Sequence, residues 1–61
     1  MDPDATLALA RDADATPAER ATAAYDLLDW LDRGGFLPAG TERRALLAEL
    51  ETIARTGNFL T

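Results

Sequence analysis

The side chains best suited to chemistry in this sequence are carboxylates. Asp26, Asp29 and Asp32 recur every third residue in a stretch whose apolar spacing predicts a helix, so they form a drifting stripe along it. Two carboxylates are enough for acid/base chemistry of the kind that glycosidases use. Nothing in the flanking sequence would build a deep pocket around these three, which favours a solvated acidic face. We therefore expect no catalytic residue here.

The other residue types on which enzymes rely are missing. The sequence has no Ser, Cys, His or Lys, so Ser–His pairs, Cys–His pairs and Schiff-base lysines are excluded. The run Asp12-Ala13-Asp14 begins like a calcium loop, but Pro17 stands where the loop needs Gly and Ala23 where it needs Glu. Gly34-Gly35 follows no strand and precedes no Gly-Lys-Ser/Thr, so it is not a phosphate loop. We predict a protein that is not an enzyme and has no metal and no cofactor.

Charge is unevenly distributed along the 61 residues. The net charge is −5; residues 1–33 carry eight acidic residues against three arginines, and residues 34–61 carry three of each. A net-acidic chain repels nucleic acid, so we expect no direct nucleic-acid binding. No apolar run approaches the roughly 20 residues of a membrane span, and residues 1–4 are acidic where a signal peptide is basic. These features predict a cytoplasmic protein without membrane contact.

Capping signals divide residues 1–33 into two helices. Asp2 can cap a short helix that Pro3 begins and that ends near Arg11, and residues 12–15 form an acidic linker after it. Thr16, Pro17 and Glu19 have the spacing of a capping box and predict a central helix over 16–33. Five residues of that helix fall within one arc of about 120°; they are Ala21, Ala24, Leu27, Leu28 and Leu31.

The second half of the chain predicts a turn and a returning helix. Gly34-Gly35 can adopt the left-handed end of a helix, after which Phe36 and Leu37 fold back over the helix end. We place the turn at 34–41, a Thr41-capped helix at 42–56 and a tail at 57–61. Salt bridges should join Arg43 and Arg44 to Asp29 and Asp32 at the end of the central helix; the alternative is a small anion- or carboxylate-binding patch that faces a partner.

Together these elements predict one small all-α domain, residues 1–61. Its fold is an antiparallel helical hairpin with a short additional N-terminal helix. The core is expected to consist of the apolar residues that face inward on the three helices, with one residue from the tail: Leu7, Ala24, Leu27, Leu28, Leu31, Leu46, Leu50, Ile53 and Phe59. Because a domain of this size buries a marginal core, association with a second copy or a partner could complete it.

Trp30 and Tyr25 are the strongest individual indications of a binding role. A Trp in so small a domain can belong to the core, but Trp30 lies off the main apolar arc and close in sequence to Phe36 and Leu37. Trp and Tyr are frequent in binding hot spots. We therefore predict a non-enzymatic protein-interaction module that self-associates or binds a protein partner through Trp30, Phe36, Leu37 and Tyr25. The alternative is an acidic decoy that occupies a basic nucleic-acid-binding surface with its face of Asp26, Asp29 and Asp32 and with the acidic residues of 2–14.

Residues 27–38, Leu-Leu-Asp-Trp-Leu-Asp-Arg-Gly-Gly-Phe-Leu-Pro, resemble segments of small uncharacterised helical proteins from GC-rich actinobacteria and their phages. The resemblance covers about a fifth of the chain and carries over no functional residue. It implies an accessory role in a phage or prophage, in which a small protein acts by binding a host factor.

Overall fold

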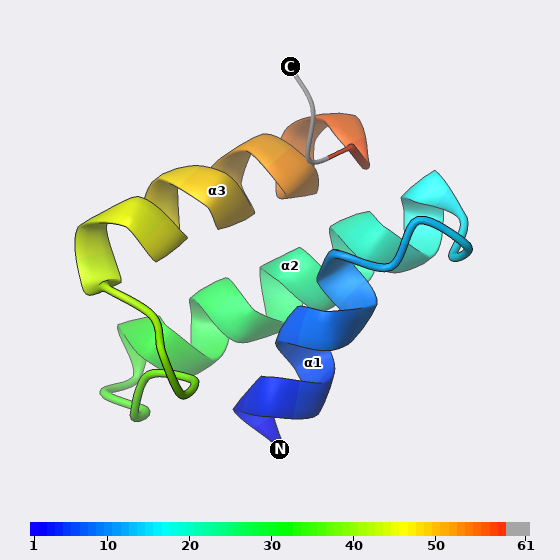
Figure 1. The fold of residues 1–61 in the computed structure, drawn as a ribbon. Coiled ribbons are helices and arrows are strands. Elements are labelled where there is room, and N and C mark those ends of the chain that lie inside the picture. The colour runs from blue at the N-terminus through cyan, green and yellow to red at the C-terminus, as the bar shows by residue number, and fades with distance from the viewer. Residues whose placement is uncertain (59–61) are drawn as a thin grey trace.

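Three helices make up the fold in a computed structural model that describes residues 1–58. They are α1 (Pro3–Ala10), α2 (Pro17–Asp32) and α3 (Arg43–Thr56), and no strand occurs in the described part. Figure 1 shows α3 returning along α2 in the opposite direction, while α1 crosses in front of α2. The predicted all-α hairpin with a short N-terminal helix is confirmed. None of these three helices is both long and apolar enough to cross a membrane.

The first two helices begin at the capping residues that the sequence predicts. The Asp2 carboxylate accepts hydrogen bonds from the backbone N–H groups of Asp4, at 3.0 Å, and Ala5, at 3.2 Å. At the start of α2 the Glu19 N–H donates to the Thr16 hydroxyl at 3.1 Å, and the Thr16 N–H donates to the Glu19 carboxylate at 3.0 Å. This reciprocal pair is a complete capping box, which satisfies two N–H groups left free at a helix start.

The start of α3 differs from the prediction by one residue. Glu42 caps the helix, because its carboxylate accepts from the backbone N–H groups of Arg44 at 3.1 Å and Ala45 at 2.8 Å. The predicted cap, Thr41, instead donates its hydroxyl to the Pro38 carbonyl at 2.6 Å. A carboxylate offers one oxygen to each N–H group and is also favoured by the helix dipole. The prediction of Thr41 as the cap is therefore wrong.

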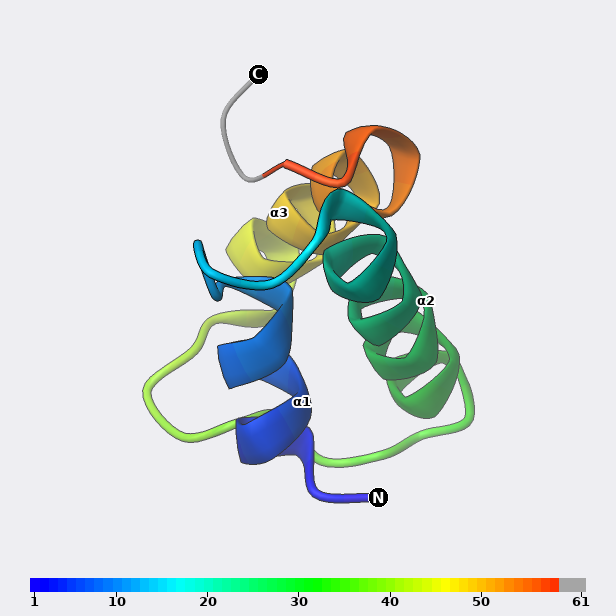
Figure 2. The ribbon, with the colours of Figure 1, turned by 90° about the vertical axis from the view of Figure 1, so that its right-hand side faces the viewer.

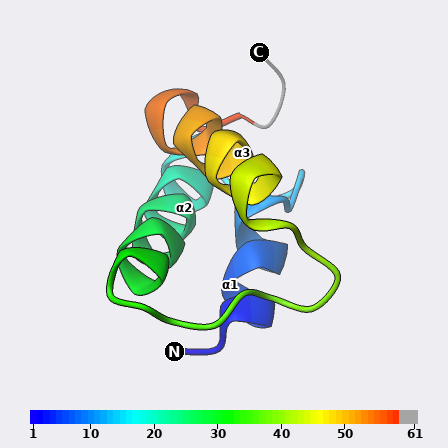
Figure 3. The same cartoon turned by 90° about the vertical axis from the view of Figure 1, so that its left-hand side faces the viewer.

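The end of α2 is a Schellman turn built on the two glycines. The Gly35 N–H donates to the Trp30 carbonyl at 2.9 Å and the Gly34 N–H to the Leu31 carbonyl at 3.1 Å. Gly34 has a φ of +87°, which a residue with a Cβ adopts only at a cost. The turn fixes the direction in which the chain leaves α2, and Figure 3 shows the following loop crossing the N-terminal end of α1 on its way from α2 to α3.

The core lies between the three helices, with α2 contributing the largest share. Seven of the predicted core residues are buried, Leu28 is only partly buried, and Phe59 lies outside the described residues. Ala10 and Ala23 are buried although they were not predicted. The buried apolar residues are Leu7, Ala10, Ala23, Ala24, Leu27, Leu31, Leu46, Leu50 and Ile53.

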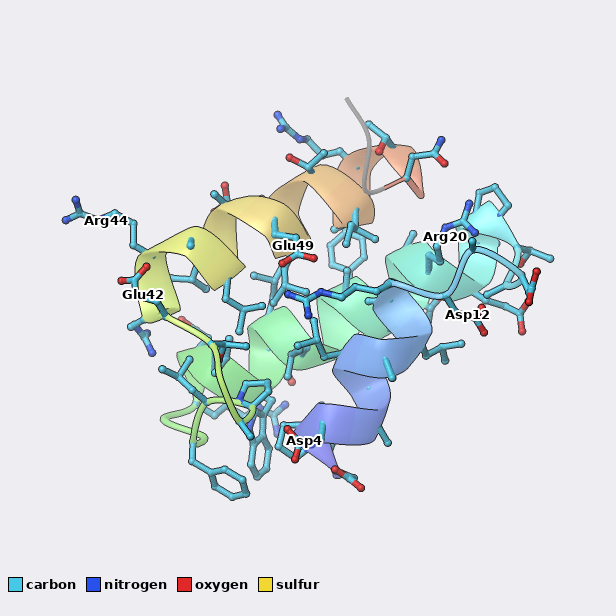
Figure 4. All side chains as sticks on the ribbon, in the orientation of Figure 1. Asp4, Asp12, Arg20, Glu42, Arg44 and Glu49 are labelled. Atoms are coloured by element: carbon cyan, nitrogen blue, oxygen red, sulfur yellow. The ribbon has the colours of Figure 1, made fainter. Side chains whose placement is uncertain are left out.

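Ion pairs form at different places from those predicted. Arg11, just after α1, makes a bidentate pair with Glu49 of α3, with both N–O distances 2.7 Å. Asp29 pairs with Arg33 at 3.1 Å on the same helix end. Within residues 1–58 these are the two ion pairs, so the predicted pairing of Arg43 and Arg44 with the end of α2 is wrong. In Figure 4 the Arg44 side chain points away from the rest of the molecule.

The Arg11–Glu49 pair predicts a loss of stability in acid. Its hydrogen bonds hold the pKa of Glu49 below the ordinary glutamate value, which is about 4.3. A carboxylate whose folded pKa is lowered stabilises the fold above the unfolded pKa, and this contribution disappears as the pH falls through the folded pKa. Urea titrations of wild type and Glu49→Gln should therefore converge as the pH falls below about 4.3. An equal difference in stability at pH 7 and in strong acid would contradict the role assigned to the pair.

Candidate functional site

Trp30 and Phe36 meet at the end of α2, and we call them, together with the adjacent Leu37, the aromatic cluster. The rings of Trp30 and Phe36 meet edge to face, with centroids 5.4 Å apart and planes at 85°. The indole N–H of Trp30 donates to the Phe36 carbonyl at 3.0 Å. The Schellman turn supplies the reversal that makes both contacts possible, so the predicted folding back of Phe36 over the helix end is confirmed.

The members of the aromatic cluster differ in exposure. Trp30 and Leu37 are partly buried against the core, whereas Phe36 is 68% exposed. Trp30 thus combines the two roles considered from sequence, since it packs against the core and also contacts the Phe36 ring. The result is an exposed phenyl ring on a backbone that is already fixed.

Gly35 is required for the close approach of the chain to the Trp30 ring. A Cβ at this position would lie 2.3 Å from Cε2 and 2.4 Å from Nε1 of Trp30. Contacts this short force either the indole or the loop to move. Sequence reasoning assigned Gly35 only to the turn and missed this packing requirement, because nothing local indicates which ring lies against the glycine.

We expect Gly35→Ala to displace the indole from its position. Tryptophan emission should shift to longer wavelength and near-ultraviolet circular dichroism should weaken, because Trp30 is the only Trp and loses its packing. Gly34→Ala is the matched control: its φ of +87° makes it destabilising, but its Cβ would contact nothing within 4 Å. Equal spectral changes in the two folded variants would show that strain in the turn, and not contact with Trp30, is responsible.

The loop that carries Phe36 is also fixed at its far end. The Ala39 N–H donates to the Asp4 carboxylate of α1 at 2.9 Å, and Pro38 is buried. Figure 4 shows Asp4 at the foot of α1, beside this loop. Phe36 therefore lies between two attachments, one to α2 through Trp30 and one to α1 through Asp4.

Tyr25, the fourth predicted anchor, lies on a different surface. It is 61% exposed and lines a shallow groove between α2 and α3 with Leu28, Ala54 and Arg55. Five helical steps separate Tyr25 from Trp30, a rotation of about 140° around α2. The structure therefore brings three of the four predicted anchors together and leaves Tyr25 apart from them.

The three aspartates of the predicted acidic face are all exposed but do not share one surface. Asp26 lines a groove between α1 and α2, together with Asp2 and Glu19. Asp29 and Asp32 line a groove between α2 and α3. The drift of a three-residue spacing around the helix explains this division.

Arg20 is the most highly connected polar residue, and sequence reasoning did not identify it. It is only 6% exposed, and Figure 4 shows it between the α1–α2 linker and the end of α3. Its guanidinium donates to the carbonyls of Ala15 at 2.5 Å, Gly57 at 2.7 Å and Asp12 at 3.1 Å, and to the Asn58 side chain at 3.3 Å. Arg20 thus joins three segments of the chain.

The helical spacing contained a signal for Arg20. It precedes Ala24, Leu27 and Leu31 by four, seven and eleven residues, which places it on the buried side of α2. Carbonyl groups of the protein itself surround its guanidinium, so we assign Arg20 a structural role and not a ligand-binding one.

No group of three or more Asp or Glu side chains in residues 1–58 has the arrangement of a metal site. Comparisons of the chain with family models, with curated proteins and with solved structures find no match.

Proposed function

We propose that this chain is a small non-enzymatic protein-interaction module that self-associates or binds a protein partner through exposed apolar side chains. Phe36 is the anchor, supported by Trp30 and Leu37. The resemblance of residues 27–38 to segments of small actinobacterial and phage proteins extends the proposal to an accessory role in a phage or prophage.

The observation that carries the proposal is the combination of exposure and fixed geometry at Phe36. A phenyl ring that is 68% exposed remains in contact with water unless another surface covers it. The bonds from Trp30 and to Asp4 already order its backbone, so a binding partner would lose less conformational entropy in docking there. Preorganised aromatic anchors of this kind are typical of binding hot spots.

The acidic decoy is the less favoured proposal. It depends on a continuous acidic surface that includes Asp26, Asp29, Asp32 and the acidic residues of 2–14, and the three aspartates of α2 line two separate grooves. It also gives no role to the exposed ring of Phe36.

Phe36→Ala tests the aromatic cluster as the association surface. We expect the variant to keep its helical circular dichroism, because the lost side chain is exposed, and to weaken self-association at least tenfold, about 1.4 kcal/mol. Light scattering over a dilution series measures the association. Leu9→Ala is the control, since Leu9 is also an exposed apolar residue, at 41%, but lies on α1.

Two results would count against this assignment. One is self-association that Phe36→Ala leaves unchanged. The other is equal weakening of self-association by Phe36→Ala and Leu9→Ala, which would indicate nonspecific hydrophobic association and not a defined site. If wild type does not self-associate, the proposal retains only its second form, in which a different protein covers Phe36.

A further inference from the structure

A second surface, separate from the aromatic cluster, lies between α1 and α2. Figure 2 shows these two helices side by side, with α3 beyond their upper ends. The groove between them has a volume of about 510 Å³. Small or apolar residues of both helices make up much of its lining: Ala5, Leu9, Ala18, Thr22 and Ala23. Small side chains on adjacent helices leave room for a third helix to approach closely.

This groove also carries negative charge. Asp2, Glu19 and Asp26 line it, and no arginine does. Glu19 holds its charge firmly, because the hydrogen bonds from Thr16 lower its pKa. Asp2 and Glu19 each cap a helix through one carboxylate oxygen, Oδ1 and Oε1 respectively, which leaves their second oxygens for other donors. The lining of the groove therefore combines apolar and acidic side chains.

The dimensions of the groove indicate the size of its occupant. Glu19 and Asp26 are seven residues apart on α2, which corresponds to about 10 Å along the helix axis. A helix of about two turns spans the same distance. Two basic residues seven positions apart on such a helix could approach Glu19 and Asp26 together, with apolar residues between them facing the apolar part of the lining.

We propose that the α1–α2 groove binds a basic amphipathic helix from a different protein. Its apolar residues lie on Leu9 and the alanines, and its Arg or Lys side chains, two turns apart, pair with Glu19 and Asp26. This inference rests on the proposed function, because it names the class of partner that the interaction module binds. The surface involved does not include Phe36.

A second copy of this chain does not provide that helix. The sequence has six arginines and no lysine, and no two of the arginines are seven residues apart. In α3, the helix with the most basic residues, Arg44 and Arg55 are separated by eleven positions and by Glu49 and Glu51. The charge pattern of the groove is thus complementary to a partner and not to the protein itself.

The experiment uses a synthetic amphipathic helix with two arginines seven positions apart and two leucines between them on the same face. Its binding to the full chain is measured by fluorescence anisotropy at low and moderate salt. A second peptide, with glutamate in place of both arginines, tests the charge requirement. We expect the first peptide to bind, with weaker affinity at higher salt, and the second not to bind.

Four variants of the protein locate the binding surface. Asp26→Lys should weaken peptide binding about three- to tenfold by replacing an attraction with a repulsion, and Leu9→Ala should weaken it about tenfold. Asp32→Lys makes the same charge change in the groove between α2 and α3 and should weaken peptide binding less than twofold. Phe36→Ala should also leave peptide binding unchanged, so that failure of the aromatic-cluster proposal and failure of this one give different results.

Four outcomes would overturn the proposal. The first is no binding of the arginine peptide, and the second is equal binding of the glutamate peptide. The third is self-association of the wild-type chain that Asp26→Lys abolishes, which would assign the groove to a second copy. Equal weakening by Asp26→Lys and Asp32→Lys would likewise show that net charge, and not this groove, attracts the peptide.

Discussion

We expect Arg20→Met to leave most molecules of the protein unfolded. The side chain is 6% exposed, and its loss removes the donor that the structure gives to the carbonyls of Ala15 and Gly57, while the Asp12 carbonyl keeps the Ala15 N–H. A buried acceptor left without its donor costs about 1–3 kcal/mol, so the two carbonyls together cost about 2–6 kcal/mol. A domain of this length has a total stability of roughly 3–9 kcal/mol. The expected loss is therefore comparable to the whole.

Urea denaturation followed by circular dichroism measures this effect. Arg44→Met is the matched control, because Arg44 is exposed at the start of α3 and makes no ion pair in the described residues. The control should change stability by less than about 0.5 kcal/mol. If Arg20→Met lost less than about 1 kcal/mol, the carbonyls around Arg20 would have to be satisfied by water, and its role in joining the three segments would be wrong.

Gly57→Ala is expected to separate the end of α3 from the start of α2. Gly57 has a φ of +71°, and a Cβ there would lie 2.7 Å from both the Cβ and the carbonyl oxygen of Pro17. The left-handed backbone costs an alanine about 1–2 kcal/mol. The contact with Pro17 adds about 1–3 kcal/mol, because backbone atoms cannot give way as a flexible side chain can.

Gly40→Ala separates these two contributions. Gly40 has nearly the same φ, +73°, but a Cβ there would meet nothing within 4 Å. Thermal unfolding of both variants should show a clearly larger loss for Gly57→Ala, and the difference measures the packing against Pro17. Equal losses would mean that the helix ends move apart freely and that their contact contributes little to stability.

The helix boundaries could be predicted because they are encoded by short-range chemistry. The capping box of Thr16 and Glu19 and the cap at Asp2 involve residues at most three positions apart, and both form as expected. The exception is Thr41, where two adjacent residues could both act as caps. Glu42 prevailed because its carboxylate reaches two N–H groups at once.

Long-range contacts explain what the sequence did not reveal. The ion pair of Arg11 with Glu49 spans 38 residues, and the hydrogen bond of Arg20 to Gly57 spans 37. Charge alone does not identify such partners. Arg20 shows most clearly what the sequence can and cannot predict. The helical spacing indicates that Arg20 lies on the buried side of α2. It does not indicate that the carbonyl groups that accept its hydrogen bonds come from the linker and from the end of α3.

The candidate site likewise combines contacts that are local in sequence with contacts that depend on helix packing. Trp30 and Phe36 meet because they are six residues apart across a glycine turn, a local relation that the sequence contains. Tyr25 was grouped with them by residue type, but the rotation around α2 puts it in another groove. The α1–α2 groove depends on how two helices pack, and no pattern within either helix indicated it.

The most direct test of the proposed interaction module is the mass of the wild-type chain by sedimentation equilibrium, over a wide range of concentrations and at two salt levels. The account predicts a concentration-dependent dimer or larger species that persists when the salt is raised, because burial of Phe36 and its neighbours is apolar and weakly screened. A monomer at every concentration would contradict self-association through the aromatic cluster. An assembly that dissociates as salt rises would show that charges, and not the aromatic cluster, hold it together.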